Sequence, residues 1–227
     1  TSAQLSALVN NSGHAVSFNG GLNATSNGAT TLNASSGGAL SIGGAGNALT
    51  ATNATALNLS GIAIGAGGVT FRSINASGGA NGIVISNVTG GAFEVTGDGP
   101  SDPANLTRGR TTARQGAGSI ALGSGGAIQN TTGSAVLLNA VNAMTLRNMT
   151  LSRASPGDVT GIAITGGSLT LDNLRITGFG NDGLLANGLT GLAILHTEVE
   201  NNAKSADSAL NDESNIRLMN LAGTATL

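Results

Sequence analysis

The chain has 227 residues, of which 37 are Gly and none is Cys, Trp or Tyr, and its formal net charge is −2. With only 9% charged residues and no basic cluster outside one loop, it offers little for the counterion release that drives nucleic-acid binding, so we expect no nucleic-acid partner. No apolar run approaches the roughly 18 residues of a membrane-spanning helix, so we also expect no membrane insertion.

The N-terminal part of the chain is free of charge. Its first 70 residues contain no Lys, Arg, Asp or Glu, and the repeat pattern described below is least clear in residues 1–61. Neither end of the chain carries the charged or covering element that normally protects a strand edge. We therefore expect residues 1–227 to form one β-helix domain that is a section of a longer chain or a subunit that stacks on another.

The stretch Gly161–Gly183 shows the repeating unit. Its three apolar-alternating runs, Ile162–Ile164, Leu169–Leu171 and Leu174–Ile176, are separated by turns rich in Gly, Asp and Asn. Five of the seven steps between equivalent first runs are 21 to 26 residues long, which predicts an all-β parallel solenoid of about eight coils with three short strands per coil. The first runs are Val16–Phe18, Leu40–Ile42, Ile62–Ile64, Ile83–Ile85, Val136–Leu138, Ile162–Ile164, Leu184–Ala186 and Ile216–Leu218.

Second strands are predicted with the same period. Their outer residues are apolar and their middle residue mostly is not, as in a strand with one buried face. The turn that follows them falls on Ser73, Asn148, Asn173 or His196, where we expect stacked side chains to hydrogen-bond between coils. The second strands are Val69–Phe71, Phe93–Val95, Met144–Leu146, Leu169–Leu171 and Leu192–Ile194.

Two inserted loops, residues 97–118 and 203–214, interrupt the repeat and hold nearly half of the charged residues. Three arginines of the first loop are candidates for contact with an acidic partner or with sugar carboxylates, although a solvated loop is the simpler interpretation. These arginines are Arg108, Arg110 and Arg114, and the acidic residues of the two loops include Asp98, Asp102, Asp207 and Asp212.

The outward row of the first strands argues against catalysis. Glycoside hydrolysis needs two positioned carboxyl groups, and the middle residues of the first runs include no carboxylate. We therefore expect no catalytic residue and no enzyme activity. The alternative is a polysaccharide-degrading β-helix, a lyase or a glycoside hydrolase, with its site on the two inserted loops.

Four residues of that outward row are apolar. Val84, Leu137, Ala163 and Leu185 are predicted to form a stripe on the outside of the solenoid, which we call the contact stripe. One interpretation is a contact surface for a second rod or a neighbouring domain. The others are a mildly apolar exposed sheet, or a register assigned one residue out of place.

The evidence for metal binding is thin. The segment Gly178–Leu184 matches most of one calcium-binding nonapeptide, but that motif binds through stacked copies, so a plain turn is the preferred interpretation for Asp182. Asp98 and Asp102 are further weak calcium candidates. The two histidines, His14 and His196, lack any ligand spacing, so no cofactor is expected.

Two other regularities have simple explanations. A file of Thr50, Thr70, Thr145 and Thr170 suggests ice binding, but Thr is also a common strand residue. Asn-x-Ser/Thr sequons are attributed to composition rather than to glycosylation. They begin at Asn10, Asn23, Asn33, Asn53, Asn58, Asn75, Asn87, Asn105, Asn130 and Asn148.

The runs Asn81–Gly99, Gly123–Val141 and Gly161–Gly183 resemble the right-handed parallel β-helix repeats of large secreted bacterial surface proteins, the adhesins and autotransporter-like passengers. This resemblance covers about residues 62–221. It implies a secreted, extracellular or bacterial cell-surface location and a role as adhesin stalk, matrix component or filament-forming subunit. The implied partners are further copies, neighbouring domains of the same protein, and cell-surface or matrix carbohydrate. It transfers no catalytic residue.

Overall fold

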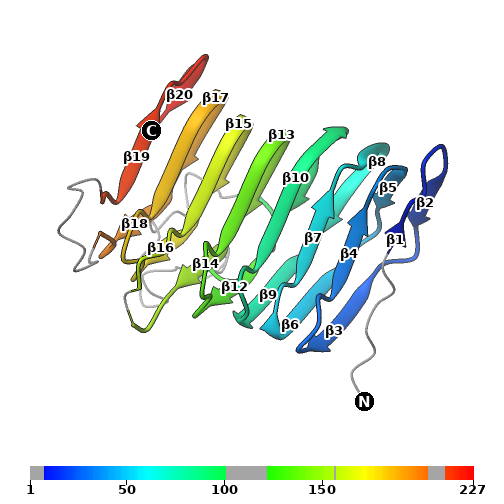
Figure 1. Ribbon diagram of the computed structural model, residues 1–227, viewed down its shortest axis with the longest axis horizontal. Helices are drawn as coiled ribbons and strands as arrows, with labels where there is room; N and C mark the ends of the chain where they lie inside the picture. Colours follow the sequence, from blue (N-terminus) through cyan, green and yellow to red (C-terminus); the bar gives the residue numbers. More distant parts are fainter. Residues whose placement is uncertain (1–7, 101–121, 156, 204–212) are drawn as a thin grey trace.

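The computed structural model describes residues 8–100, 122–155, 157–203 and 213–227. Within these ranges the chain is all-β without a helix, and its parallel strands stack into a β-solenoid of about seven coils. The coils follow one another in chain order along the long axis of the molecule (Figure 1). The predicted fold class is confirmed, with about one coil fewer than expected.

The strands form two sheets that run along the solenoid. A 13-stranded sheet contains the first and second strands of the coils, and a 7-stranded sheet contains the third strands. The larger sheet comprises β1 (Leu8–Val9), β2 (Ala15–Phe18), β4 (Leu32–Ser35), β5 (Ala39–Ile42), β7 (Leu57–Ser60), β8 (Ala63–Phe71), β10 (Ile83–Gly90), β11 (Phe93–Val95), β13 (Val136–Arg147), β15 (Ile162–Asp172), β17 (Leu184–Leu195), β19 (Ile216–Met219) and β20 (Thr224–Thr226). The smaller sheet comprises β3 (Asn23–Asn27), β6 (Ala48–Ala54), β9 (Ser73–Gly78), β12 (Gly126–Gln129), β14 (Met149–Ser152), β16 (Arg175–Thr177) and β18 (Glu198–Glu200).

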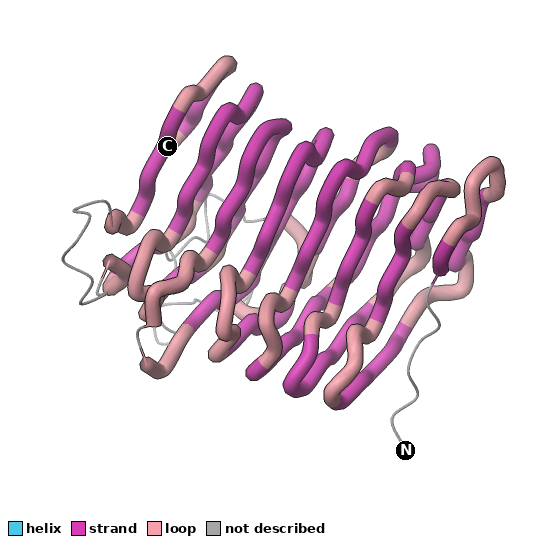
Figure 2. Tube along the Cα trace, viewed as in Figure 1, coloured by secondary structure: helices cyan, strands magenta, loops and turns pink. Residues whose placement is uncertain are grey.

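The later coils differ from the expected three short strands. β13, β15 and β17 each join the predicted first and second strands into one strand of 11 or 12 residues (Figure 2). In β15 the bend falls at Gly166 and Gly167, whose φ angles are 69° and 84°. Glycine adopts such angles without steric cost, so the strand turns a corner while pairing with its neighbours continues.

The register of the first strands is confirmed from Ile83 onward and wrong before it. Ile83 pairs with Val136, and the file continues through Ile162 and Leu184 to Ile216. Toward the N-terminus, however, Ile83 pairs with Leu57, and Leu57 pairs with Leu32. Three other runs were predicted as first strands, but each lies one strand further along its coil. Their pairings with one another and with β8 and β10 show this. The runs are Val16–Phe18, Leu40–Ile42 and Ile62–Ile64.

The predicted second strands pair with one another as expected. Val69 lies beside Phe93, which lies beside Met144, and the file continues through Leu169 to Leu192. These residues are buried between the two sheets, as are the inward residues of the first and third strands. Each fully buried Leu or Ile side chain contributes about 1.5–3 kcal/mol, so stacking supplies a core that one coil lacks.

The corners of the coils are built from residues with positive φ, which stack in columns. Gly and Asn are the residues that adopt this left-handed conformation most readily, so the corners explain why the chain is rich in both. Four exposed sequon asparagines, Asn10, Asn53, Asn87 and Asn130, are corner residues of this kind. The column after the first strand is Asn10, Ser36, Gly61, Asn87, Ala140, Gly166, Gly188 and Asn220, and the column after the third strand includes Gly28, Asn53, Gly78, Asn130, Gly178 and Asn201.

The first insertion leaves the solenoid at a corner without disturbing the stacking. β10 and β11 pair directly with β13, although Val84 and its partner Leu137 are 53 residues apart. Val95 pairs with Leu146 and Gly126 with Met149, so by register residues 98–125 are extra relative to the next coil.

The described residues contain no helix long and apolar enough to cross a membrane.

Candidate functional site

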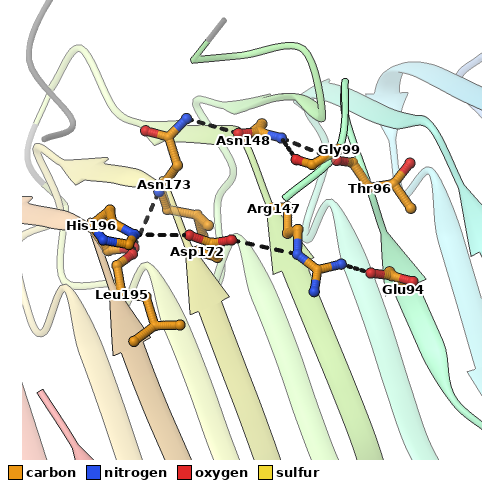
Figure 3. Close-up of polar contacts among 11 residues, drawn as sticks. Glu94, Thr96, Gly99, Arg147, Asn148, Asp172, Asn173, Leu195 and His196 are labelled. Atoms are coloured by element: carbon orange, nitrogen blue, oxygen red, sulfur yellow. Dashed lines mark hydrogen bonds and ion pairs between the residues drawn. The ribbon is translucent and has the colours of Figure 1, made fainter. Parts of the chain in front are cut away.

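A network of charged side chains lies where the second strands end, centred on Arg147 at the end of β13 (Figure 3). Nη1 of Arg147 pairs with Oε1 of Glu94 in β11, and its Nε lies 3.5 Å from Oδ2 of Asp172 at the end of β15. Nδ1 of His196 lies 3.3 Å from the other oxygen of Asp172. The four residues come from four consecutive coils, so each contact joins one coil to the next.

Beside this network, two asparagines form a hydrogen-bonded ladder. Nδ2 of Asn173 donates to Oδ1 of Asn148 over 2.7 Å. Nδ2 of Asn148 donates in turn to the backbone carbonyls of Thr96, at 3.0 Å, and Gly99, at 2.8 Å (Figure 3). The predicted turn ladder is therefore confirmed for these two asparagines, and it fixes one stem of the first insertion.

The other predicted turn residues behave differently. His196 has the positive φ of 51° that the corner requires, but its ring contacts Asp172 rather than continuing the amide ladder. Ser73 is the first residue of β9. In the N-terminal part, the side chain of Asn47 hydrogen-bonds between coils as that of Asn148 does. Its Oδ1 accepts from the backbone N–H of Leu22 at 2.6 Å, and its Nδ2 donates to the carbonyl of Thr70 at 2.8 Å.

The charged network does not have the arrangement of a hydrolytic carboxylate pair. In such a pair the two carboxyl groups face a bond of the substrate from either side. Here Glu94 and Asp172 instead face the two sides of one guanidinium, and Asp172 is only 5% exposed. The guanidinium of Arg147 lies between the two carboxylates. The network therefore provides electrostatic contacts between neighbouring coils.

Other ion pairs among the described residues also join neighbouring coils. Arg72 contacts Asp98 at 2.7 Å, and Arg217 contacts Asp182 at 3.0 Å. On the smaller sheet, Nη2 of Arg175 is 2.6 Å from Oε1 of Glu200, and Nε is 3.6 Å from Oε2 of Glu198. Sequence reasoning missed these pairs, although the separations of 26 residues between Arg72 and Asp98 and of 25 residues between Arg147 and Asp172 each equal one coil.

These ion pairs engage two of the three calcium candidates. Asp182 is fully buried, and besides Arg217 it accepts the backbone N–H of Ser214 over 2.9 Å. Asp98 is held by Arg72, and its own N–H donates to Oγ of Ser124. The described part of the chain contains no group of three His, Cys, Asp or Glu residues placed to hold a metal ion.

Several predicted contact residues lie outside the described residues. They are the arginines Arg108, Arg110 and Arg114, while the calcium candidate Asp102 and the acidic loop residues Asp207 and Asp212 also lie outside them.

The contact stripe lies in register on the outside of the larger sheet. Val84 pairs with Leu137, Leu137 with Ala163, and Ala163 with Leu185, so the four side chains follow one another along the axis. Leu137 is 39% exposed and the other three are half-buried. The alternative of a register wrong by one residue is excluded here, because the preceding residues of the same strands are buried.

Polar residues border the stripe. At its N-terminal end lie Asn58 and Asn33, where Nδ2 of Asn58 donates to Oδ1 of Asn33 over 2.6 Å, and at its other end lies Arg217. A file of polar side chains runs parallel to the contact stripe, two residues after the stripe residue of each strand. The stripe is therefore one side chain wide. The polar file consists of Ser86, Asn139, Thr165 and Asn187.

The predicted threonine file is only partly correct. Thr70, Thr145 and Thr170 do form one outward file, with Glu94 between the first two. Thr50 lies on the other sheet, between Thr25 and Asn75. That sheet presents two outward files of mostly short hydroxyl and amide side chains from β3 to β14. They are Thr25, Thr50, Asn75, Ala127 and Thr150, and Asn27, Thr52, Ser77, Gln129 and Ser152.

The stacked parallel coils and the cross-coil contacts define the class of this protein as a β-solenoid repeat protein. Comparison with protein-family models, with curated proteins and with solved structures finds no match to this chain.

Proposed function

We propose that the chain is a structural β-solenoid of a secreted or cell-surface bacterial protein, acting as an adhesin stalk, a matrix component or a filament-forming subunit. The observation that carries this proposal is the use of charge. Four of the five described arginines, Arg72, Arg147, Arg175 and Arg217, pair with a carboxylate on a neighbouring coil. The fifth, Arg153, donates to the carbonyl of Thr131 on the preceding coil. Side chains that an enzyme would direct at a substrate are here directed at the next coil.

The work of such a protein is mechanical. Parallel strands spaced about 4.8 Å apart make about seven coils roughly 35 Å long. Backbone hydrogen bonds run along the axis, the core is continuous, and the ion pairs resist sliding of one coil on the next. A rod of this kind holds its ends at a fixed separation, as a stalk or a filament must.

The contact stripe is the surface that this proposal assigns to lateral association, with a further copy or with a neighbouring domain. Four small or medium-sized side chains bury much less than the roughly 800 Å² per partner of a stable interface. A single contact would therefore be weak, and several rods aligned side by side would hold together through multivalency. Cell-surface or matrix carbohydrate is the other proposed partner, through the inserted loops.

A cleavage assay tests the structural role against the enzymatic alternative. The chain would be incubated with a panel of acidic and neutral polysaccharides, and new reducing ends and unsaturated products would be measured. The expected result is no product above the background without protein. Product formation that disappears when Asp98, Asp102, Asp207 and Asp212 are changed together to Asn would overturn the proposal.

A second assay addresses association. Light scattering at increasing concentration would compare the natural chain with Leu137→Ser and, as a matched control on the same strand, Asn139→Ser. The expected result is concentration-dependent association that Leu137→Ser weakens and Asn139→Ser does not. Equal association of all three chains would remove the stripe from the proposal.

A further inference from the structure

We draw no further inference here: the strongest candidate, the outward face of the smaller sheet from β3 to β14 with its two files of short hydroxyl and amide side chains, is a regular small-residue array with no second observation that points to a ligand.

Discussion

The coils before Arg72 and those after it have the same architecture but different means of holding neighbours in register. The earlier coils use amides, such as Asn33 with Asn58, and Asn47 with the backbone of Leu22 and Thr70. The later coils add arginine–carboxylate pairs. The backbone ladder and apolar core are therefore sufficient for the fold, and the ion pairs are an addition to it.

Two of the ion pairs in the later coils join residues that flank an insertion. Glu94 and Arg147 lie on either side of the first insertion, and Asp182 and Arg217 lie on either side of the second. A longer connection costs more entropy to close, and a strand with an alternating pattern can slip in register. A specific contact across each insertion opposes both effects.

The largest expected effect comes from the core and should be the same in both regions. Leu57→Ala in the earlier coils and Leu171→Ala in the later ones each remove a fully buried side chain. We expect each to lower the free energy of unfolding by about 2–5 kcal/mol. Urea unfolding followed by circular dichroism would measure it. A much smaller loss for Leu57→Ala would show that the charge-free coils are packed differently.

The next effect should be confined to the later coils. Arg147→Met leaves Asp172, which is nearly buried, without its guanidinium, and we expect a loss of roughly 3 kcal/mol. Arg72→Met is the matched control, because both partners of that pair are about half exposed and its loss should cost less than about 1 kcal/mol. Thermal unfolding of the two variants would compare them.

A rescue experiment sharpens the same comparison. Arg147→Met combined with Glu94→Gln and Asp172→Asn removes the charges together, and this variant should recover part of the lost stability. No recovery would mean that the apolar stem of Arg147, rather than its charge, holds the coils together.

A smaller effect is expected at the asparagine ladder. Asn148→Ala loses the bonds to Thr96, Gly99 and Asn173 and places Ala at a φ of 57°, for an expected cost of roughly 2 kcal/mol. Asn148→Gly loses the same bonds but tolerates the backbone, so it should cost roughly 1 kcal/mol. Chemical unfolding of both variants measures the difference. If Gly is no better than Ala, the backbone conformation contributes nothing.

The smallest effect is expected from removing the first insertion. Deleting residues 98–125 joins Gly97 to Gly126 and shortens the 53-residue step to 25, the length of a regular coil. Because closure entropy varies slowly with loop length, we expect stability to change by about 1 kcal/mol or less. The circular dichroism spectrum should stay that of a β-protein. A chain that aggregates or unfolds after this deletion would show that the insertion supports the solenoid.

The sequence identifies the first strand of a coil where one alternating run is clearly more apolar than the other runs of that coil. From Ile83 onward the first runs have Ile, Leu or Val at both inward positions, except for Ala186, and their register is correct. Before Ile83 each coil offers two short alternating runs, such as Leu32–Ser35 and Leu40–Ile42, and the pattern alone does not say which is the first strand.

Less of the candidate site than of the fold could be predicted from the sequence. The contact stripe follows from period-2 alternation once the register is known, and its prediction is correct in placement. The network around Arg147 was not predicted because its members are separated by one coil or more and carry no motif. Only the spacing of opposite charges at one coil length, from Arg147 to Asp172, marks it in the sequence.

Ion pairs between charged side chains hold neighbouring coils together in the later part of the solenoid. Hydrogen exchange measured coil by coil in the natural chain and in Arg147→Met tests it most directly. We expect faster exchange in β11, β13, β15 and β17 and little change in β4 and β7. Unchanged exchange around Arg147, or an equal increase in every coil, would contradict it.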